Sequence, residues 1–354
     1  MRPLVATISL GALAHNLWVA RQHAGQARLM AVVKANAYGH GLTRALRALA
    51  AGDAYAVLSI DEAANLRQMG VEKPILLLEG FFQAAELDAI ARLQLTPTIH
   101  DAEQLDLLRR QKIGPPLDVF IKFNSGMNRL GFPLDRFDAV LDQVRACEKI
   151  RTLTLMTHFA TADEARGVNW QAEPFLRKAA TTGLPLSLAN SAALLRYPEV
   201  ARDWVRPGIM LYGASPFADV SATGLGLKPA MTLRSEIIAV QNLTAGAGLG
   251  YGLTWHADKS TKIGIVACGY ADGYPRHAPS GTPVLVCGRA TRTLGRVSMD
   301  MLYVELSGLP EAGVGSPVTL WGEGLPVEDV ARAAGTISYE LLCALAPRVP
   351  VVEV

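Results

Sequence analysis

The sequence predicts an α/β fold in two parts: a (β/α)8 barrel of the TIM type over residues 1–225, followed by a smaller, mainly β domain over residues 226–354. Up to about residue 206, eight short apolar runs alternate with segments that have helical spacing. Strict alternation of strands and helices favours a parallel sheet, and eight such units favour a closed barrel. Beyond residue 225, β-type runs separated by Gly, Pro and Asp indicate the second domain.

The predicted barrel strands are short and apolar, and helical segments with polar openings follow them. Examples are "DEAANLRQMG" after the second strand and "DAEQLDLLRRQ" after the fourth. The eight predicted strands are residues 29–33, 54–60, 74–80, 96–100, 117–124, 152–159, 184–190 and 203–206.

The first ten residues precede the first barrel helix and have two readings. The stretch "MRPLVATISLGALAHNL" has one Arg and an apolar run, as a short signal peptide would have. Polar residues interrupt that run, however, while Val5 and Ile8 suit a strand and Leu10, Leu13 and Leu17 have helical spacing. We therefore expect a strand, which is a candidate strand of the second domain, and then a helix.

The second domain is expected to be built from β-strands with one helical segment at its end. The β-type runs are residues 233–243, 261–270, 282–288 and 301–308. Only residues 326–346, "PVEDVARAAGTISYELLCALA", have helical spacing.

The composition excludes several classes of partner. The chain has 34 basic and 32 acidic residues in 354, a net charge of +2 and no basic cluster, so neither nucleic acid nor a lipid surface is an expected partner. The four cysteines include no C-x-x-C pair, which argues against a disulfide framework and a thiolate metal site. A small-molecule substrate, no metal and a reducing cytoplasm are the expectations.

Polar residues stand at the C-terminal ends of five predicted strands, where the loops of a barrel converge on one mouth. They are Lys34, Lys122, His158, Arg206, and the pair Asn190 and Ser191. Each alone has a structural explanation, such as a solvated cap, a core histidine or a surface ion pair. Unrelated surface positions would not all fall at strand ends, so together these residues indicate a site at the barrel mouth.

The lysine at the end of the first strand indicates the chemistry. Burial lowers the pKa of an amine, and a neutral amine attacks an aldehyde to form a Schiff base, which points to pyridoxal 5'-phosphate as the cofactor. Its phosphate needs backbone N–H groups, and "NSAAL" (190–194) and "RPGIMLYG" (206–213) offer them after the seventh and eighth strands.

In order along the chain, eight motifs resemble those of the alanine racemases, a family of barrel-type pyridoxal phosphate enzymes. In the barrel these are "AVVKANAYGHG", "FIKFNSGMNRLGF", "MTHFATAD" and "VRPGIMLYG". In the second domain they are "GYGLTW", "GYADGYPR", "GRVSMDM" and "SYELLC". The resemblance covers essentially the whole chain.

The resemblance implies a cofactor site. Lys34 would carry the internal aldimine, and Tyr251 would be the second catalytic base. Arg206 would face the pyridine nitrogen and leave it unprotonated, with His158 beside it. The remaining cofactor-binding residues, most of them at the phosphate, would be Tyr38, Asn190, Ser191, Gly208, Ile209 and Tyr339.

The resemblance also implies a substrate site. Arg129 would meet the substrate carboxylate and the cofactor phenolic oxygen, Met299 would offer its backbone N–H to that carboxylate, and Tyr270 would narrow the entrance. Lys122 is the position where relatives carry a carbamylated lysine. Ser298 stands where many relatives have cysteine. This difference does not affect the expected substrate site, because the resemblance assigns the carboxylate contact to the backbone of the neighbouring Met299.

The reaction implied is two-base interconversion of L-alanine and D-alanine by a cytoplasmic homodimer with shared active sites. The alternatives that the sequence leaves open are a serine or broad-specificity amino-acid racemase, a barrel-type amino-acid decarboxylase and a non-catalytic pyridoxal phosphate carrier. The carrier is disfavoured because such proteins lack the second domain. Supply of D-alanine as a peptidoglycan precursor and its degradation for carbon are not distinguished.

Overall fold

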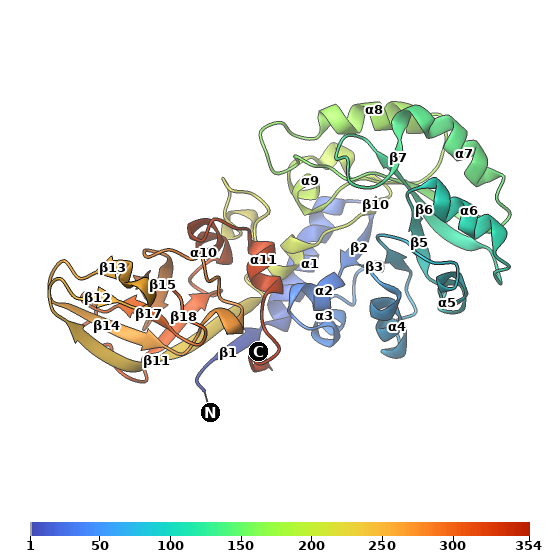
Figure 1. Ribbon diagram of the computed structural model, residues 1–354. Helices are drawn as coiled ribbons and strands as arrows, with labels where there is room; N and C mark the ends of the chain where they lie inside the picture. The colour runs from blue at the N-terminus through green and yellow to red at the C-terminus, as the bar shows by residue number, and fades with distance from the viewer. Residues whose placement is uncertain (1) are drawn as a thin grey trace. The chain divides into compact units, whose positions relative to one another are not determined.

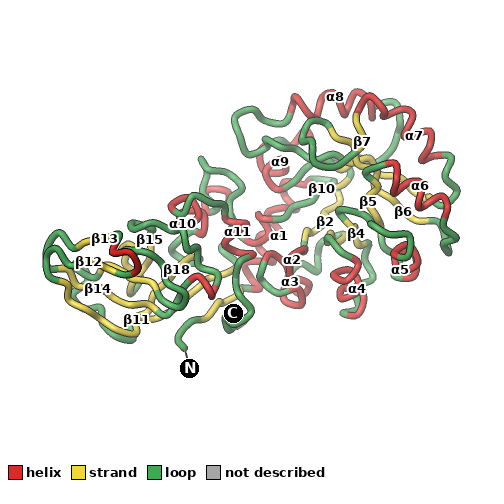
Figure 2. Tube along the Cα trace, viewed as in Figure 1, coloured by secondary structure: helices red, strands yellow, loops and turns green. Residues whose placement is uncertain are grey.

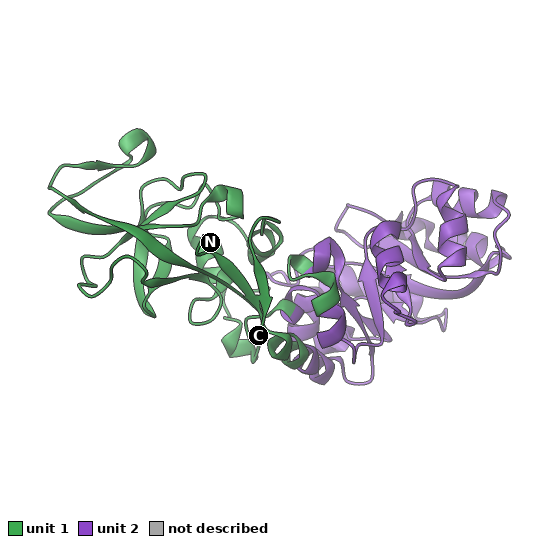
Figure 3. Ribbon diagram, turned by 90° about the horizontal axis from the view of Figure 1, so that it is seen from below, with its two compact units in different colours: residues 1–16, 38–44, 212–354 green, residues 17–37, 45–211 purple. Residues whose placement is uncertain are grey.

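The computed structural model describes residues 2–354 and divides them into two compact units (Figure 3). Unit 2 comprises residues 17–37 and 45–211 and contains the barrel. Unit 1 comprises residues 2–16, 38–44 and 212–354 of the described chain and contains the second sheet. The expected boundary at residues 225 and 226 falls inside unit 1, and we keep it as a proposed domain limit.

The barrel is a closed ring of eight parallel strands. Hydrogen bonds join them in the order β2-β3-β4-β5-β6-β8-β9-β10, and β10 pairs with β2 to close the ring. The strands are β2 (Arg28–Val32), β3 (Ala54–Val57), β4 (Ile75–Leu77), β5 (Thr96–Ile99), β6 (Leu117–Asn124), β8 (Ile150–Met156), β9 (Leu186–Ser187) and β10 (Trp204–Val205); β7 (Phe132–Pro133) is added beside β6. The predicted (β/α)8 fold class is confirmed.

Helices follow the barrel strands along the chain (Figures 1 and 2). They are α2 (Lys34–Tyr38), α3 (Leu42–Ala48), α4 (Ile60–Gln68), α5 (Glu86–Arg92), α6 (Ala102–Arg110), α7 (Phe137–Arg145), α8 (Asn169–Ala179) and α9 (Ser191–Arg196). Helix α1 (Leu10–Ala24) instead precedes β2, the first barrel strand. Short 3-10 turns are η1 (Leu134–Arg136), η2 (Pro198–Val200) and η3 (Ile209–Tyr212). The helices predicted after the second and fourth strands are confirmed as α4 and α6.

Several strands end earlier than the sequence predicted. The strand predicted over 54–60 ends at Val57, because the Ser59 side chain accepts the backbone N–H of Glu62 and begins α4. The seventh and eighth strands are reduced to two residues each in the ladder. In both, the run predicted from the sequence extends past the last residue that is hydrogen-bonded to a neighbouring strand.

Strand β6 alternates between the barrel interior and the surrounding helices. Phe123 is fully buried, and its ring centroid lies 4.4 Å from that of Phe137 in α7 and 6.4 Å from that of Phe175 in α8. Successive side chains of a strand point to opposite faces, so the neighbouring Lys122 points into the barrel. Lys122 therefore lies on the inner face of β6, and Phe123 lies on its outer face.

Unit 1 is built on an eight-stranded sheet in the order β14-β17-β16-β15-β18-β11-β1-β19, in which β14 also pairs with β11. Its strands are β1 (Val5–Ile8), β11 (Met231–Leu243), β14 (Thr261–Val266), β15 (Pro283–Val286), β16 (Arg289–Leu294), β17 (Leu302–Glu305), β18 (Pro317–Trp321) and β19 (Val351–Glu353). A separate hairpin joins β12 (Gly248–Leu249) to β13 (Trp255–His256). The expected mainly β architecture is confirmed.

The ends of the chain meet in this sheet. Strand β1 runs antiparallel to β11 and parallel to β19. The predicted C-terminal helical segment forms two helices, α10 (Val327–Ala333) and α11 (Ser338–Cys343), because Gly335 has a φ of 70° and ends the first. Further 3-10 turns are η4 (Thr223–Leu225), η5 (Tyr251–Leu253) and η6 (Tyr270–Asp272). Within residues 2–354, no helix combines the length and the apolar character needed to cross a membrane.

We predict that Phe123→Ala lowers the free energy of unfolding of the barrel by about 3–5 kcal/mol, because it leaves a cavity among buried aromatic rings. The control is Phe82→Ala, since Phe82 is 67% exposed and its loss should cost less than about 0.5 kcal/mol. Urea unfolding followed by circular dichroism measures both. Equal effects of the two substitutions would contradict the assigned packing of β6.

Candidate active site

Lys34 opens a left-handed turn directly after β2. The turn α2 has the hydrogen bonding of a helix, but Ala35, Asn36, Ala37 and Tyr38 have φ values between 51° and 55°. None of the four is glycine, and each L-residue in this conformation costs about 1–2 kcal/mol. Strain of this kind persists only where neighbouring contacts hold it, and it concentrates at functional sites.

Glu62 of α4 supplies one such contact. Its Oε1 accepts the backbone N–H of Ala35 at 2.8 Å, and its Oε2 accepts the backbone N–H of Leu58 at 2.8 Å. The carboxylate that caps α4 therefore also binds the first residue of the left-handed turn. Glu62 was not predicted as a site residue, although the capping pattern of Ser59 and Glu62 is visible in the sequence.

Arg206 is a buried cation at the C-terminal ends of three neighbouring strands. Its guanidinium donates to the Ser187 hydroxyl, to the Thr157 carbonyl at 2.8 Å and to the Leu188 carbonyl at 3.2 Å. Only 3% of the residue is exposed, and burial lowers its pKa to about 10, so it stays charged at neutral pH. The barrel thus holds a positive charge at its mouth without a carboxylate partner among these contacts.

His158 lies beside this guanidinium and is neutral. Arg206 Nη2 is 3.4 Å from His158 Nδ1, and because a guanidinium only donates, Nδ1 is the acceptor. Burial holds the pKa of His158 well below its ordinary value, and the charges of Arg206, Lys122, Arg129 and Lys34 lower it further. Four cations from separate parts of the barrel therefore act on one imidazole.

Lys122 shares this electrostatic environment. Burial, followed by the charges of Arg206 and Arg129, lowers its pKa to about 8. A fraction of the amine is consequently neutral near physiological pH, which is the form that reacts with CO₂. Glu79 opposes this shift and His100 lies near enough for Lys122 to lower its pKa in turn.

The loop after β6 presents Arg129. The Asn124 Oδ1 accepts the backbone N–H groups of Gly126 and Asn128, both at 3.0 Å, and its Nδ2 donates to Asn128 Oδ1 at 2.9 Å. Asn128 has a φ of 57°, and the next residue, Arg129, is exposed. An asparagine at the strand end therefore shapes the loop that carries the arginine.

Residues after β9 and β10 form a small polar cradle. Asn190 caps α9 by accepting the backbone N–H of Ala193 at 2.9 Å. The buried Ser191 hydroxyl accepts the backbone N–H of Gly208 at 2.8 Å and that of Met210 at 3.4 Å. Ile209, between those two, is 1% exposed. The two segments that the sequence analysis proposed for a phosphate are thus bonded to each other.

Three tyrosines gather in unit 1. The rings of Tyr38 and Tyr212 stack with centroids 4.6 Å apart, and the ring of Tyr339 lies 6.1 Å from that of Tyr38. Burial, with Tyr339 and Cys343 nearby, raises the pKa of Tyr38, so its hydroxyl remains a proton donor. Tyr212 was not singled out from the sequence, although it lies in the "RPGIMLYG" motif.

The other predicted residues of unit 1 are exposed apolar side chains. Tyr251 is 71% exposed in η5, where Gly250, Gly252 and Leu253 all have positive φ. The loop passes close to the Tyr303 ring, because a Cβ added at Gly250 would lie 3.0 Å from that ring. Tyr270 and Met299 are 38% and 52% exposed. Each unit thus carries part of the predicted set, and no group of His, Cys, Asp and Glu within residues 2–354 is arranged to bind a metal.

Comparison with known proteins agrees with this architecture. The family model for the N-terminal domain of alanine racemase matches residues 8–216, and that for its C-terminal domain matches residues 230–353. The alanine racemase of Thiobacillus denitrificans is 68% identical over 354 residues, which cover 100% of this chain and 96% of that protein. The alanine racemase of Nitrosomonas eutropha is 56% identical, and the match covers 100% of this chain and 99% of that protein.

Solved structures agree closely as well. The biosynthetic alanine racemase from Pseudomonas aeruginosa has a TM-score of 0.98 at 49% identity, with 100% of both chains covered. The alanine racemase from Acinetobacter baumannii has a TM-score of 0.93 at 39% identity, also with 100% of both chains covered. A parallel barrel with a basic mouth, joined to a mainly β domain, here defines an isomerase of the amino-acid racemase class. The chain belongs to the alanine racemase family.

We predict that the left-handed turn makes Ala35 tolerant of glycine. Ala35→Gly should leave the free energy of unfolding unchanged or raise it by up to about 1 kcal/mol, because it removes a strained Cβ. Ala35→Val should lower it by about 2 kcal/mol, since a β-branched residue fits this φ poorly.

The matched control is Ala14→Gly in α1, another exposed alanine, where glycine should cost about 1 kcal/mol in a right-handed helix. Urea unfolding curves of the three variants supply the comparison. A destabilisation by Ala35→Gly as large as that by Ala14→Gly would show that residue 35 is not left-handed.

Proposed function

We propose that this chain interconverts L-alanine and D-alanine, using pyridoxal 5'-phosphate and two bases, Lys34 and Tyr251. The observation that carries the proposal is the cationic barrel mouth, where Arg206 lies 3.4 Å from His158 and the charges of Lys34, Lys122 and Arg129 also lower the pKa of that imidazole. Membership of the alanine racemase family supports the reaction and the substrate.

The residues present fit the cofactor. Pyridoxal phosphate carries a dianionic phosphate and a phenolic oxygen, and an anion of this charge suits a mouth lined by four cations. When bound, it supplies an aldehyde for the amine of Lys34 and an electron sink for the charge that remains when the Cα proton leaves. The hydrogen-bond partners of the Arg206 guanidinium are a hydroxyl, two carbonyls and the His158 imidazole. None of these partners is a carboxylate that would compete with the cofactor for this guanidinium.

The chain's own groups hold the cofactor in this proposal. Arg206 would face the ring nitrogen and, as a permanent donor, would leave that nitrogen unprotonated. His158 Nδ1 accepts from the same Arg206 Nη2 that donates to the Thr157 and Leu188 carbonyls. The phosphate is held by the segments after β9 and β10 together with two tyrosines of the helical turns. The residues of this set are Tyr38, Asn190, Ser191, Gly208, Ile209 and Tyr339.

Proton transfer falls to two side chains on opposite faces of the substrate carbon. Lys34 Nζ removes or returns the proton on one face, and Tyr251 Oη does so on the other. A tyrosine has an ordinary pKa of about 10, so it acts as a base at neutral pH only beside a cation. We propose that Arg206 supplies this charge, since the lowered pKa of His158 leaves its imidazole neutral.

The substrate carboxylate is bound by the Arg129 guanidinium and by the backbone N–H of Met299, with Tyr270 at the entrance. We propose that Lys122 carries a carbamate, because its lowered pKa of about 8 leaves neutral amine for CO₂. The negative carbamate would neutralise part of the local positive charge and orient Arg129. A pocket closed by Tyr251, Tyr270 and Met299 would suit a methyl side chain, and this would favour alanine over serine and longer amino acids.

We further propose a cytoplasmic homodimer that supplies D-alanine as a peptidoglycan precursor. Tyr251, Leu253 and Met299 are large apolar side chains of unit 1 that are 71%, 54% and 52% exposed. Large apolar side chains that are this exposed suit burial against a second copy of the chain. In such a dimer Tyr251 serves the barrel of the partner.

We predict that Lys34→Ala abolishes racemisation of L-alanine, with a loss of at least about 1,000-fold, because both the covalent cofactor link and one base are removed. Loss of optical rotation measures the rate. Borohydride reduction of the wild-type protein should leave the cofactor on the peptide containing Lys34. A label on another lysine, or a wild-type protein that leaves L-alanine unchanged, would refute the proposal.

Mixing two inactive variants tests the shared site. If Tyr251 acts in the partner's barrel, heterodimers of Lys34→Ala and Tyr251→Phe contain one site with both defects and one intact site. Random mixing should then restore roughly a quarter of the wild-type sites. No recovery, with heterodimers demonstrated by mass spectrometry, would show that each tyrosine serves its own barrel.

A further inference from the structure

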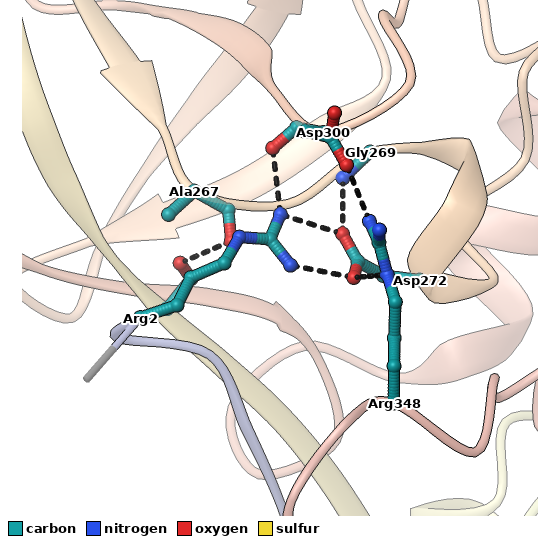
Figure 4. A network of polar contacts seen from close by, with 7 residues as sticks. Arg2, Ala267, Gly269, Asp272, Asp300 and Arg348 are labelled. Atoms are coloured by element: carbon teal, nitrogen blue, oxygen red, sulfur yellow. Dashed lines mark hydrogen bonds and ion pairs between the residues drawn. The ribbon is translucent and has the colours of Figure 1, made fainter.

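Unit 1 contains a fully buried carboxylate, that of Asp272, which the proposed reaction does not use. Four N–H groups donate to its two oxygens (Figure 4). Arg2 binds both oxygens at 2.6 and 2.7 Å, Arg348 Nε binds Oδ1 at 2.8 Å, and the Gly269 backbone N–H binds Oδ2 at 2.8 Å. The carboxylate is therefore satisfied by two arginines from opposite ends of the chain.

A second aspartate extends this network. Arg348 Nη2 donates to Asp300 Oδ1 at 2.6 Å, and Arg2 Nη2 donates to the Asp300 carbonyl at 2.7 Å. Two arginines thus balance two aspartates, and the network joins the turn 269–273 to the turn 298–301 (Figure 4). Both turns carry residues of the proposed substrate site.

The two turns are also bonded backbone to backbone. The Tyr270 N–H donates to the Ser298 carbonyl and the Ala271 N–H donates to the Met299 carbonyl, both at 3.0 Å. The approach is so close that a Cβ added at Gly269 would lie 2.3 Å from each of those two carbonyl oxygens. Any shift of the 269–273 turn must therefore move the backbone of Met299 as well.

Stability alone is a weak reason for such a network. A buried ion pair loses solvation that its Coulomb energy only partly returns, and apolar residues of similar volume are often as stable. Satisfied buried networks do, however, impose one arrangement on the segments that they join. The segments joined here are those that present Tyr270 and the backbone N–H of Met299.

We propose that Asp272, held by Arg2 and Arg348, is a positioning residue that sets the backbone of Tyr270 and Met299 for the substrate carboxylate. This inference rests on the proposed function, in which the Met299 backbone binds the substrate carboxylate and Tyr270 lies at the entrance. It assigns to the first and last segments of the chain a role in substrate affinity, although neither contains a residue of the proposed site.

The ionisation of Asp272 agrees with this geometry. Burial alone would raise its pKa, but the hydrogen bonds from Arg2, Arg348 and the Gly269 N–H outweigh burial and hold the pKa below its usual range. A carboxyl whose pKa is depressed on folding stabilises the fold above its unfolded pKa, and this contribution is lost only as the pH falls through the folded pKa. The network is therefore intact throughout the neutral range.

The test compares Asp272→Asn, Arg348→Gln and Arg2→Gln with the control Arg289→Gln. Arg289 makes an exposed ion pair with Glu311 at 2.9 Å in the same unit and contacts neither turn. We expect Asp272→Asn to lower kcat/KM for L-alanine by about 10- to 100-fold, mainly through a higher KM, because the carboxylate-binding N–H is displaced. Arg2→Gln and Arg348→Gln should each raise KM by a smaller factor, and Arg289→Gln should leave KM unchanged.

A second readout does not depend on activity. Hydrogen exchange followed by mass spectrometry should show faster exchange of peptides covering residues 266–274 and 296–302 in Asp272→Asn, and unchanged exchange there in Arg289→Gln. If Asp272→Asn does not fold, the milder Arg2→Gln must show the same two changes to a lesser degree.

The outcomes separate the two proposals. A wild-type protein that does not racemise alanine overturns the proposed function, whereas an active wild type with unchanged exchange in the variants overturns the positioning role. Faster exchange without a change in KM also overturns it, because the network would then serve stability alone.

Discussion

A guanidinium buried without a carboxylate partner among its contacts is the constraint on which the candidate site depends. Arg206 donates to the Thr157 carbonyl directly after β8, to the Ser187 hydroxyl in β9 and to the Leu188 carbonyl directly after β9. Removing a charge from water is costly unless its hydrogen bonds are made. Ordered strand ends around Arg206 are therefore a requirement for folding the barrel mouth as well as for its chemistry.

The charge on Arg206 determines what its neighbours can do. His158 stays neutral and accepts a hydrogen bond, so it orients the guanidinium instead of adding to the positive charge. Lys122 has a pKa of about 8, lowered by burial and then by Arg206, which makes it available for reaction with CO₂. One buried cation thus helps to set the protonation of two neighbouring basic residues.

Patterns with a fixed period predicted most of the fold. Strand β16 was missed because its "RATRTL" run carries little apolar periodicity, and β18 was missed although the buried Val318 and Leu320 stand two residues apart in it. The site residues at strand ends were predictable because a barrel gathers them at one mouth. The left-handed turn after Lys34 and the bonds to Asp272 were not, because they depend on contacts between distant segments.

The protonation of His158 tests the central claim most directly, and NMR of protein with 15N-labelled histidine measures it. The chain has seven histidines, and His158→Gln identifies the signal of interest. We expect this imidazole to stay neutral well below the ordinary histidine pKa of about 6.5, and its pKa to rise in Arg206→Met, because one lowering charge is removed. Titration near the ordinary value in the wild type, or no change on removal of Arg206, would contradict the account.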